Sequence, residues 1–135
     1  MYLLDSNAWI ALFRQKSAAL LGELKRRPAA EIVLCPVVLA ELWYGVCRSD
    51  AAHRPTNQEL VEDLRARYVS VPFDDAAALD AAELRASLAA RGEPIGPYDL
   101  LIAAIARTRG LTLVTGNQTE SSRVPGLKTE DWKGT

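Results

Sequence analysis

The chain has 135 residues, a length that suits one domain with a substantial core, and we treat residues 1–135 as that domain. Its composition, 49% hydrophobic and 24% charged, is that of an ordinary soluble globular protein. The formal net charge of −1 gives no sign of nucleic acid, so such a substrate would need a local basic rim or bound cations. His53 is the single histidine and lies in a polar segment, which argues against histidine metal sites and Ser–His catalysis.

The cysteines and the apolar runs bear on where the protein works. Cys35 and Cys47 lie in or next to apolar runs, which predicts reduced core residues and no disulfide or zinc framework. No apolar run approaches ~20 residues, and the N-terminus lacks a basic leader followed by an apolar stretch. We therefore expect a cytoplasmic protein without a membrane anchor.

The first element is a short buried strand over Tyr2–Leu4, which runs directly into Asp5. Ser6 and Asn7 are good caps for a helix that begins at Ala8 and extends to about residue 27, with a break near residues 15–17. A carboxylate at the carboxyl end of a strand is where open α/β sheets bind ligands. Asp5 is therefore either a metal ligand or the cap of the helix that follows.

A second strand over Ile32–Cys35 is apolar throughout, as expected of a strand buried on both faces. Pro36 then opens a helix that extends through Val46 and is apolar on nearly every side, which predicts that it is mostly buried. Glu41 is the single charge in that run, and a buried carboxylate needs a partner. No lysine or arginine lies three or four residues away, so the partner is either a distant basic residue or a metal ion.

The rest of the chain continues the alternation of helices and strands. We expect, in order, a loop at 48–58, a short helix at 59–68, a strand at 69–71, a helix from Asp74 or Asp75 to Arg91, a rigid turn at 93–98, a helix from Asp99 to about residue 109, a strand at 111–115, and a short fifth strand at 124–127 before a frayed tail. Asp99 is either a metal ligand or an acid that complements the helix dipole. Glu83 is either a surface charge or a fourth carboxylate of the same site.

This alternation predicts an α/β fold with a mainly parallel sheet of four or five strands and helices on both faces. In such a sheet, helices that follow or precede a strand begin at the carboxyl edge of the sheet. Five side chains from distant parts of the sequence therefore meet at one edge: Asp5, Glu41, Asp99, Thr115 and Asn117. Carboxylates in such a group suit hard divalent cations, which would also reverse the negative charge that repels a phosphate.

Four motifs carry a family resemblance: Leu4-Asp5-Ser6-Asn7, Ala40-Glu41-Leu42, Ile95-Gly96-Pro97-Tyr98-Asp99-Leu100-Leu101-Ile102-Ala103-Ala104 and Leu113-Val114-Thr115-Gly116-Asn117. They resemble the motifs of the PIN-domain nucleases, and the resemblance covers essentially the whole chain. The tail Arg123-Val124-Pro125-Gly126-Leu127-Lys128-Thr129-Glu130-Asp131-Trp132 is similar to that of the VapC toxins within this group.

The resemblance implies a PIN-like fold and an endoribonuclease that depends on Mg²⁺ or Mn²⁺, the toxin of a toxin–antitoxin pair. Asp5, Glu41 and Asp99 match the acidic catalytic and metal-binding positions, and Thr115 matches a hydroxyl residue that supports the site. Asn117 stands where many members carry a fourth acid, and Ser6 where threonine is common. The implied reaction is in-line attack of water on the phosphodiester, leaving a 3′-hydroxyl and a 5′-phosphate.

The implied partners are an RNA substrate, a VapB-type antitoxin and a second copy of the chain in a homodimer. An antitoxin arginine reaching the acidic pocket would be a means of inhibition. Candidates for phosphate contacts are the basic residues Arg14, Lys16, Lys25, Arg26, Arg27, Arg48 and Arg123. Two alternatives remain: a PIN nuclease that processes RNA without being a toxin, and a non-catalytic binding module whose acids only cap helices.

Overall fold

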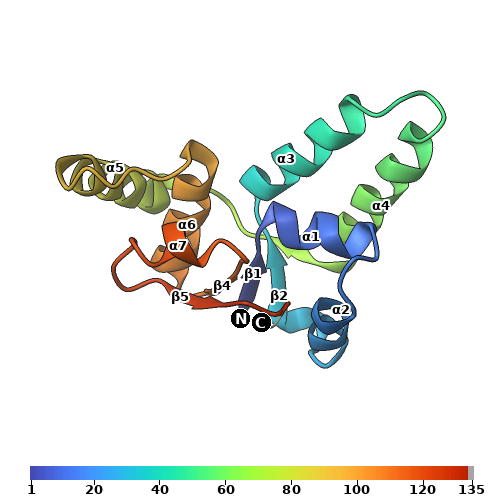
Figure 1. Ribbon diagram of the computed structural model, residues 1–135, viewed down its shortest axis with the longest axis horizontal. Helices are drawn as coiled ribbons and strands as arrows, with labels where there is room; N and C mark the ends of the chain where they lie inside the picture. The colour runs from blue at the N-terminus through green and yellow to red at the C-terminus, as the bar shows by residue number, and fades with distance from the viewer. Residues whose placement is uncertain (134–135) are drawn as a thin grey trace.

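The computed structural model describes residues 1–133 and has one five-stranded sheet with seven α-helices in that part of the chain (Figure 1). The strands are β1 (Tyr2–Leu4), β2 (Ile32–Leu34), β3 (Val69–Ser70), β4 (Thr112–Val114) and β5 (Lys128–Glu130). The helices are α1 (Ser6–Phe13), α2 (Ala18–Lys25), α3 (Pro36–Cys47), α4 (Arg54–Arg67), α5 (Asp75–Ala90), α6 (Pro97–Arg109) and α7 (Gln118–Ser121), with a 3₁₀ turn, η1, at Ala29–Glu31.

The sheet order is β3-β2-β1-β4-β5, and all four pairings are parallel. β1 lies at the centre, where Leu3 pairs with Val33 on one side and with Leu113 on the other. These three side chains are almost fully buried, which explains the continuous apolar runs in the sequence. The predicted parallel α/β sheet with flanking helices is confirmed.

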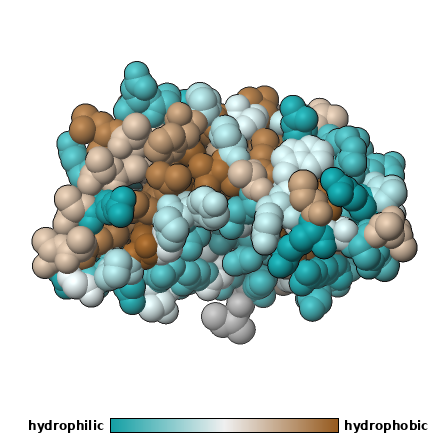
Figure 2. Space-filling model, turned by 90° about the horizontal axis from the view of Figure 1, so that it is seen from above, coloured by the Kyte–Doolittle hydropathy of each residue, from teal (hydrophilic) through white to brown (hydrophobic). Residues whose placement is uncertain are grey.

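Two helix pairs stand beside the carboxyl edge of the sheet. In Figure 1, α3 and α4 form a hairpin on the right, α5 and α6 pack together on the left, and β1 ends between the two pairs. Figure 2 looks down on this edge and shows apolar side chains gathered over the left half of the surface. None of the helices that the structure describes is long and apolar enough to cross a bilayer.

Several predicted boundaries near the N-terminus need correction. α1 begins at Ser6, and its cap is Asp5, not Ser6 or Asn7, because the Asp5 carboxylate accepts a hydrogen bond from the Ala8 backbone at 2.8 Å. The predicted break near residues 15–17 is confirmed, since Gln15 takes a positive φ of 53° and Ser17 caps α2. The second strand ends at Leu34, one residue earlier than predicted.

The prediction that α3 is mostly buried is wrong. Only the stripe Val38, Leu42 and Val46 is buried, while Tyr44 is 65% exposed. Cys47 is also exposed, so the expectation that both cysteines lie in the core holds only for Cys35. The apolar and aromatic residues of α3 therefore lie on two sides of the helix, one packed in the core and one exposed to solvent.

Three segments differ from the predicted pattern farther along the chain. α4 begins at Arg54, inside the predicted loop, because Pro55 suits a first helical turn and the Asp50 carboxylate orders the turn before it. The fifth strand is Lys128–Glu130 and not residues 124–127, since Val124 packs against α5 and α6. Trp132 is buried, and of the tail expected to fray, residues 134–135 lie outside the described part.

Candidate active site

The ends of β1 and β4 bring three of the predicted residues into contact. Asp5 follows β1 and is 7% exposed, with one carboxylate oxygen capping α1. The hydroxyl of Thr115, which follows β4 and is also buried, donates to the same carboxylate. Thr115 Oγ1 in turn accepts a hydrogen bond from the Asn117 backbone at 3.0 Å. Asp5 is thus both a helix cap and a buried acid held in place by its neighbours.

Burial is the largest influence on the Asp5 carboxyl, and it raises the pKa above the ordinary value of an aspartate. The hydrogen bonds from Thr115 and Ala8 act in the opposite direction and lower the pKa, as does the positive charge of Lys133. A desolvated carboxylate that no lysine or arginine pairs with binds a proton or a cation more readily than an exposed one.

Asp99 lies in the first turn of α6, whose N-cap is Gly96. A Cβ atom on residue 96 would lie 3.2 Å from Asp99 Oδ2, so the carboxylate folds back over the glycine. Desolvation first, and then the negative charges of Glu120, Asp5 and Glu41, raise the pKa of Asp99 to about 6. The negative charges of the other three acids thus act on Asp99 at this edge of the sheet.

Glu120 on α7 is a member of this group that the sequence reasoning missed. Its negative charge is, after desolvation, the next cause that raises the pKa of Asp99, and both side chains line the same small cavity. Asn117 caps α7 and donates from Nδ2 to Glu120 Oε2 at 2.8 Å. The signal was an asparagine followed three residues later by a glutamate, the spacing of a capping box.

A small cavity of about 20 Å³ lies among these side chains, and its polar lining includes Asp5, Asp99, Thr115, Asn117 and Glu120. This volume accommodates about one water molecule. The predicted convergence on one edge of the sheet is therefore present for Asp5, Asp99, Thr115 and Asn117.

Glu41 is placed differently from the other acids. It lies on α3 and lines a neighbouring groove of about 300 Å³ between α1, α3 and α4. Its Oε1 atom is buried and has no hydrogen-bond partner among the described residues. The predicted need for a partner therefore stands, and no lysine or arginine within residues 1–133 forms an ion pair with Glu41, Asp5 or Asp99.

A divalent cation fits the chemistry of this group. The donors are hard carboxylate and amide oxygens, one of them is a buried orphan, and none of the acids forms an ion pair with a lysine or arginine within residues 1–133. As placed, no three histidine, cysteine or acidic side chains within residues 1–133 are close enough to hold an ion together. A cation bound by Asp5, Glu41 and Asp99 would therefore require these side chains to turn toward one another.

Two further predicted residues take other places. Ser6 is buried in the first turn of α1, consistent with a supporting position. Glu83 lies on the exposed face of α5, so the interpretation as a surface charge is confirmed.

The basic residues predicted to contact phosphates fall into two groups, those already bonded to other groups of the protein and those that line a pocket. Arg27 is tied to Glu23, and Arg123 donates to the Pro94 carbonyl at 2.9 Å. Arg14 and Lys16 line the pocket beside Asp5. Lys133, which was not among the candidates, lines the same pocket.

An acidic cluster at the carboxyl edge of a parallel α/β sheet is an arrangement expected of metal-dependent phosphodiesterases. The PIN domain family model matches residues 2–126, and the chain belongs to this family.

Similar proteins match over almost the whole chain. The tRNA(fMet)-specific endonuclease VapC of Shigella flexneri is 38% identical over 131 residues, which is 97% of each chain. The structure of DNA-bound VapBC from Salmonella typhimurium matches with a TM-score of 0.89 and 34% identity over 97% of each chain. The structure of VapBC2 from Rickettsia felis bound to a DNA fragment from its promoter matches with a TM-score of 0.87 and 32% identity over 97% of this chain and 98% of that one.

Proposed function

We propose that the protein is a metal-dependent endoribonuclease and the toxin of a VapBC-type toxin–antitoxin pair, with residues 1–135 acting as one PIN unit. The observation that carries the proposal is the group of Asp5, Glu41, Asp99 and Glu120, in which burial first and the neighbouring negative charges second raise the pKa of Asp99 to about 6. Four acids without a cationic partner among the described residues are costly for stability, and a divalent ion removes this cost. The relatives named VapC support ribonuclease activity.

In this proposal Asp5 and Asp99 hold Mg²⁺ or Mn²⁺, and Glu41 contributes the third carboxylate. When bound, the ion lowers the pKa of water and stabilises negative charge on the leaving oxygen. Asn117 donates from Nδ2 to Glu120 and so helps to hold this fourth carboxylate near Asp99. Thr115 and the Ala8 N–H fix the Asp5 carboxylate so that its orientation is set before substrate arrives.

The proposed protein partner is a VapB-type antitoxin, supported by the VapBC complexes among similar structures. The exposed apolar side of α3 and the groove that contains Glu41 are the proposed contact surface. The orphaned Glu41 Oε1 is a suitable acceptor for an antitoxin arginine, which would inhibit by occupying the acidic pocket. A homodimer and a cytoplasmic location complete the proposal, and light scattering of the purified protein tests the dimer.

The experiment is cleavage of total RNA by the purified chain, with tRNA examined first because two similar proteins are named tRNA(fMet)-specific endonucleases. We expect discrete cuts in Mg²⁺ or Mn²⁺ and none in EDTA. Intact RNA under all metal conditions would contradict the proposal. Two further experiments separate the alternatives. A toxin should arrest growth when its expression is induced, and an adjacent small gene should rescue growth, whereas an RNA-processing nuclease should do neither. Saturable Mn²⁺ binding would distinguish either nuclease from a non-catalytic binding module.

A further inference from the structure

A second feature of the site is a groove of about 650 Å³ whose lining includes Asp5 but not Asp99. One wall is the turn between α1 and α2, which carries Arg14 and Lys16, and the other is the segment from Asp131 to Lys133. Asn117 lies at the end next to the acidic group. The groove is thus open to a ligand whose reacting group sits at Asp5 while the rest of the ligand lies between two walls.

The first wall is fixed by the way α1 ends. The backbone N–H of Lys16 donates to the Ala11 carbonyl at 3.0 Å, and that of Gln15 donates to Leu12 at 3.1 Å. Together with the positive φ of Gln15, these bonds form a Schellman-type helix end. The turn places Arg14 and Lys16 on the same groove, and neither is paired with a carboxylate within residues 1–133.

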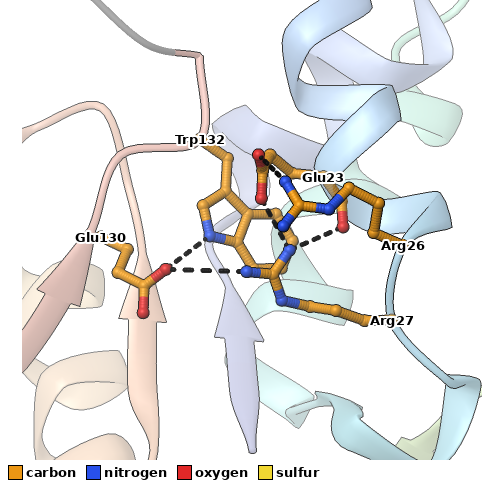
Figure 3. A network of polar contacts seen from close by, with 5 residues as sticks. All are labelled: Glu23, Arg26, Arg27, Glu130 and Trp132. Atoms are coloured by element: carbon orange, nitrogen blue, oxygen red, sulfur yellow. Dashed lines mark hydrogen bonds and ion pairs between the residues drawn. The ribbon is translucent and has the colours of Figure 1, made fainter.

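The second wall is anchored by Trp132. Figure 3 shows the guanidinium group of Arg27 lying beside this ring, with contacts to Glu23 and Glu130. The Arg27 carbon lies 4.2 Å from the Trp132 ring centre and 4.7 Å from that of Tyr2, and Trp132 Nε1 donates to Glu130 at 3.0 Å.

Because Trp132 is held in this way, its neighbours in sequence are held as well. The Lys133 backbone N–H donates to Asp131 Oδ1 at 3.0 Å. Lys133 and Asp5 line the same groove, and the positive charge of Lys133 lowers the pKa of the Asp5 carboxyl.

The charges of this groove differ from those of the whole molecule. The chain carries a formal net charge of −1, yet the groove has three cations, Arg14, Lys16 and Lys133, against Asp131 and the site carboxylate Asp5. Unpaired cations along a groove that ends at a phosphodiesterase-type site suit a chain of phosphates. Cations along the groove would hold the phosphates of an RNA strand in a fixed position relative to the acidic site, and they do so without forming ion pairs with the acids.

We propose that this groove binds the RNA strand on one side of the scissile phosphate, with Arg14, Lys16 and Lys133 contacting backbone phosphates. The proposal rests on the proposed function, since it takes RNA as the substrate. Contacts to phosphates position the strand without reading its bases, so the groove supplies affinity and register.

The test measures binding of a short fluorescein-labelled single-stranded RNA by anisotropy, in an Asp99→Asn background that prevents cleavage. The Arg14→Gln/Lys16→Gln variant is compared with Arg65→Gln/Arg67→Gln, which removes the same charge from exposed positions on α4. We expect the groove variant to weaken binding at least tenfold and to reduce the salt slope by about 1.4, at ~0.7 for each phosphate contact. Lys133→Gln should give about half that change in slope, and the α4 variant none.

Equal affinity and slope in the groove variants and the background protein would overturn the proposal, even if the unmodified enzyme cleaves RNA. Normal RNA binding together with loss of antitoxin capture would also overturn it and assign the groove to the protein partner. Conversely, charge-dependent RNA binding in this groove would uphold it even if the unmodified chain failed to cleave RNA, in which case only the proposed activity fails. Unchanged thermal unfolding of each variant confirms that the chain is folded.

Discussion

The Asp99 carboxyl, with its raised pKa, predicts an unusual dependence of stability on pH. Its folded-state pKa of about 6 exceeds the ordinary value of 3.8, so the folded chain binds the proton more tightly than the unfolded one. The stability from this group is therefore fully present below about pH 4 and is lost as the pH rises through about 6. The full shift would correspond to ~3 kcal/mol, but the residue is exposed, and we expect ~1 kcal/mol after solvent screening.

The assay is urea unfolding in EDTA at pH 4.5 and pH 7.5. Between these values we expect the unmodified protein to lose ~1 kcal/mol more than Asp99→Asn, because the variant lacks the titrating carboxyl. Asp63→Asn, which removes an exposed aspartate on α4, should behave like the unmodified protein. Parallel changes in stability for Asp99→Asn and the unmodified protein would refute the reasoning. The apparent affinity for Mn²⁺ should also fall by up to tenfold per pH unit below about 6, since the cation and the proton compete.

Three substitutions test other parts of the structure. Gly96→Ala places a methyl group 3.2 Å from Asp99 Oδ2, so Mn²⁺ titration should show severalfold weaker binding, with unchanged thermal unfolding. Gln15→Gly relieves a positive φ and should stabilise the chain by about 0.5–1 kcal/mol in urea unfolding, a gain that a loss of stability would contradict. Trp132→Ala removes a buried ring that stacks on Arg27 and should cost about 3–5 kcal/mol, whereas a loss below ~1 kcal/mol would show that the C-terminal segment is not anchored.

The position of the site could be predicted from topology. Apolar runs identified β1 and β4, and parallel strands end at the same edge, so Asp5 and Thr115 had to be neighbours. Asp99 followed because the helix before a strand begins at that edge. This reasoning places residues to within a turn of helix, which is enough to find a site but not to give ligand distances.

Two features lay beyond that reasoning. Glu120 was missed because α7 has only four residues and no apolar periodicity, so nothing marked it as a helix except the spacing from Asn117. The exposed side of α3 was missed because an apolar residue that covers the core and one that meets a partner look alike in sequence. Leu42 and Tyr44 lie two residues apart in the same run of apolar and aromatic residues, and only the structure shows that Leu42 is buried and Tyr44 exposed.

The central claim is that Asp5 acts through its charge and not merely as a helix cap. Asp5→Asn keeps a side-chain oxygen able to cap α1 but removes the carboxylate, and Asp74→Asn makes the same change at the cap of α5. We predict that Mg²⁺-dependent RNA cleavage falls at least ~100-fold in Asp5→Asn and stays near normal in Asp74→Asn, with both variants folded. Near-normal cleavage by Asp5→Asn would contradict the account.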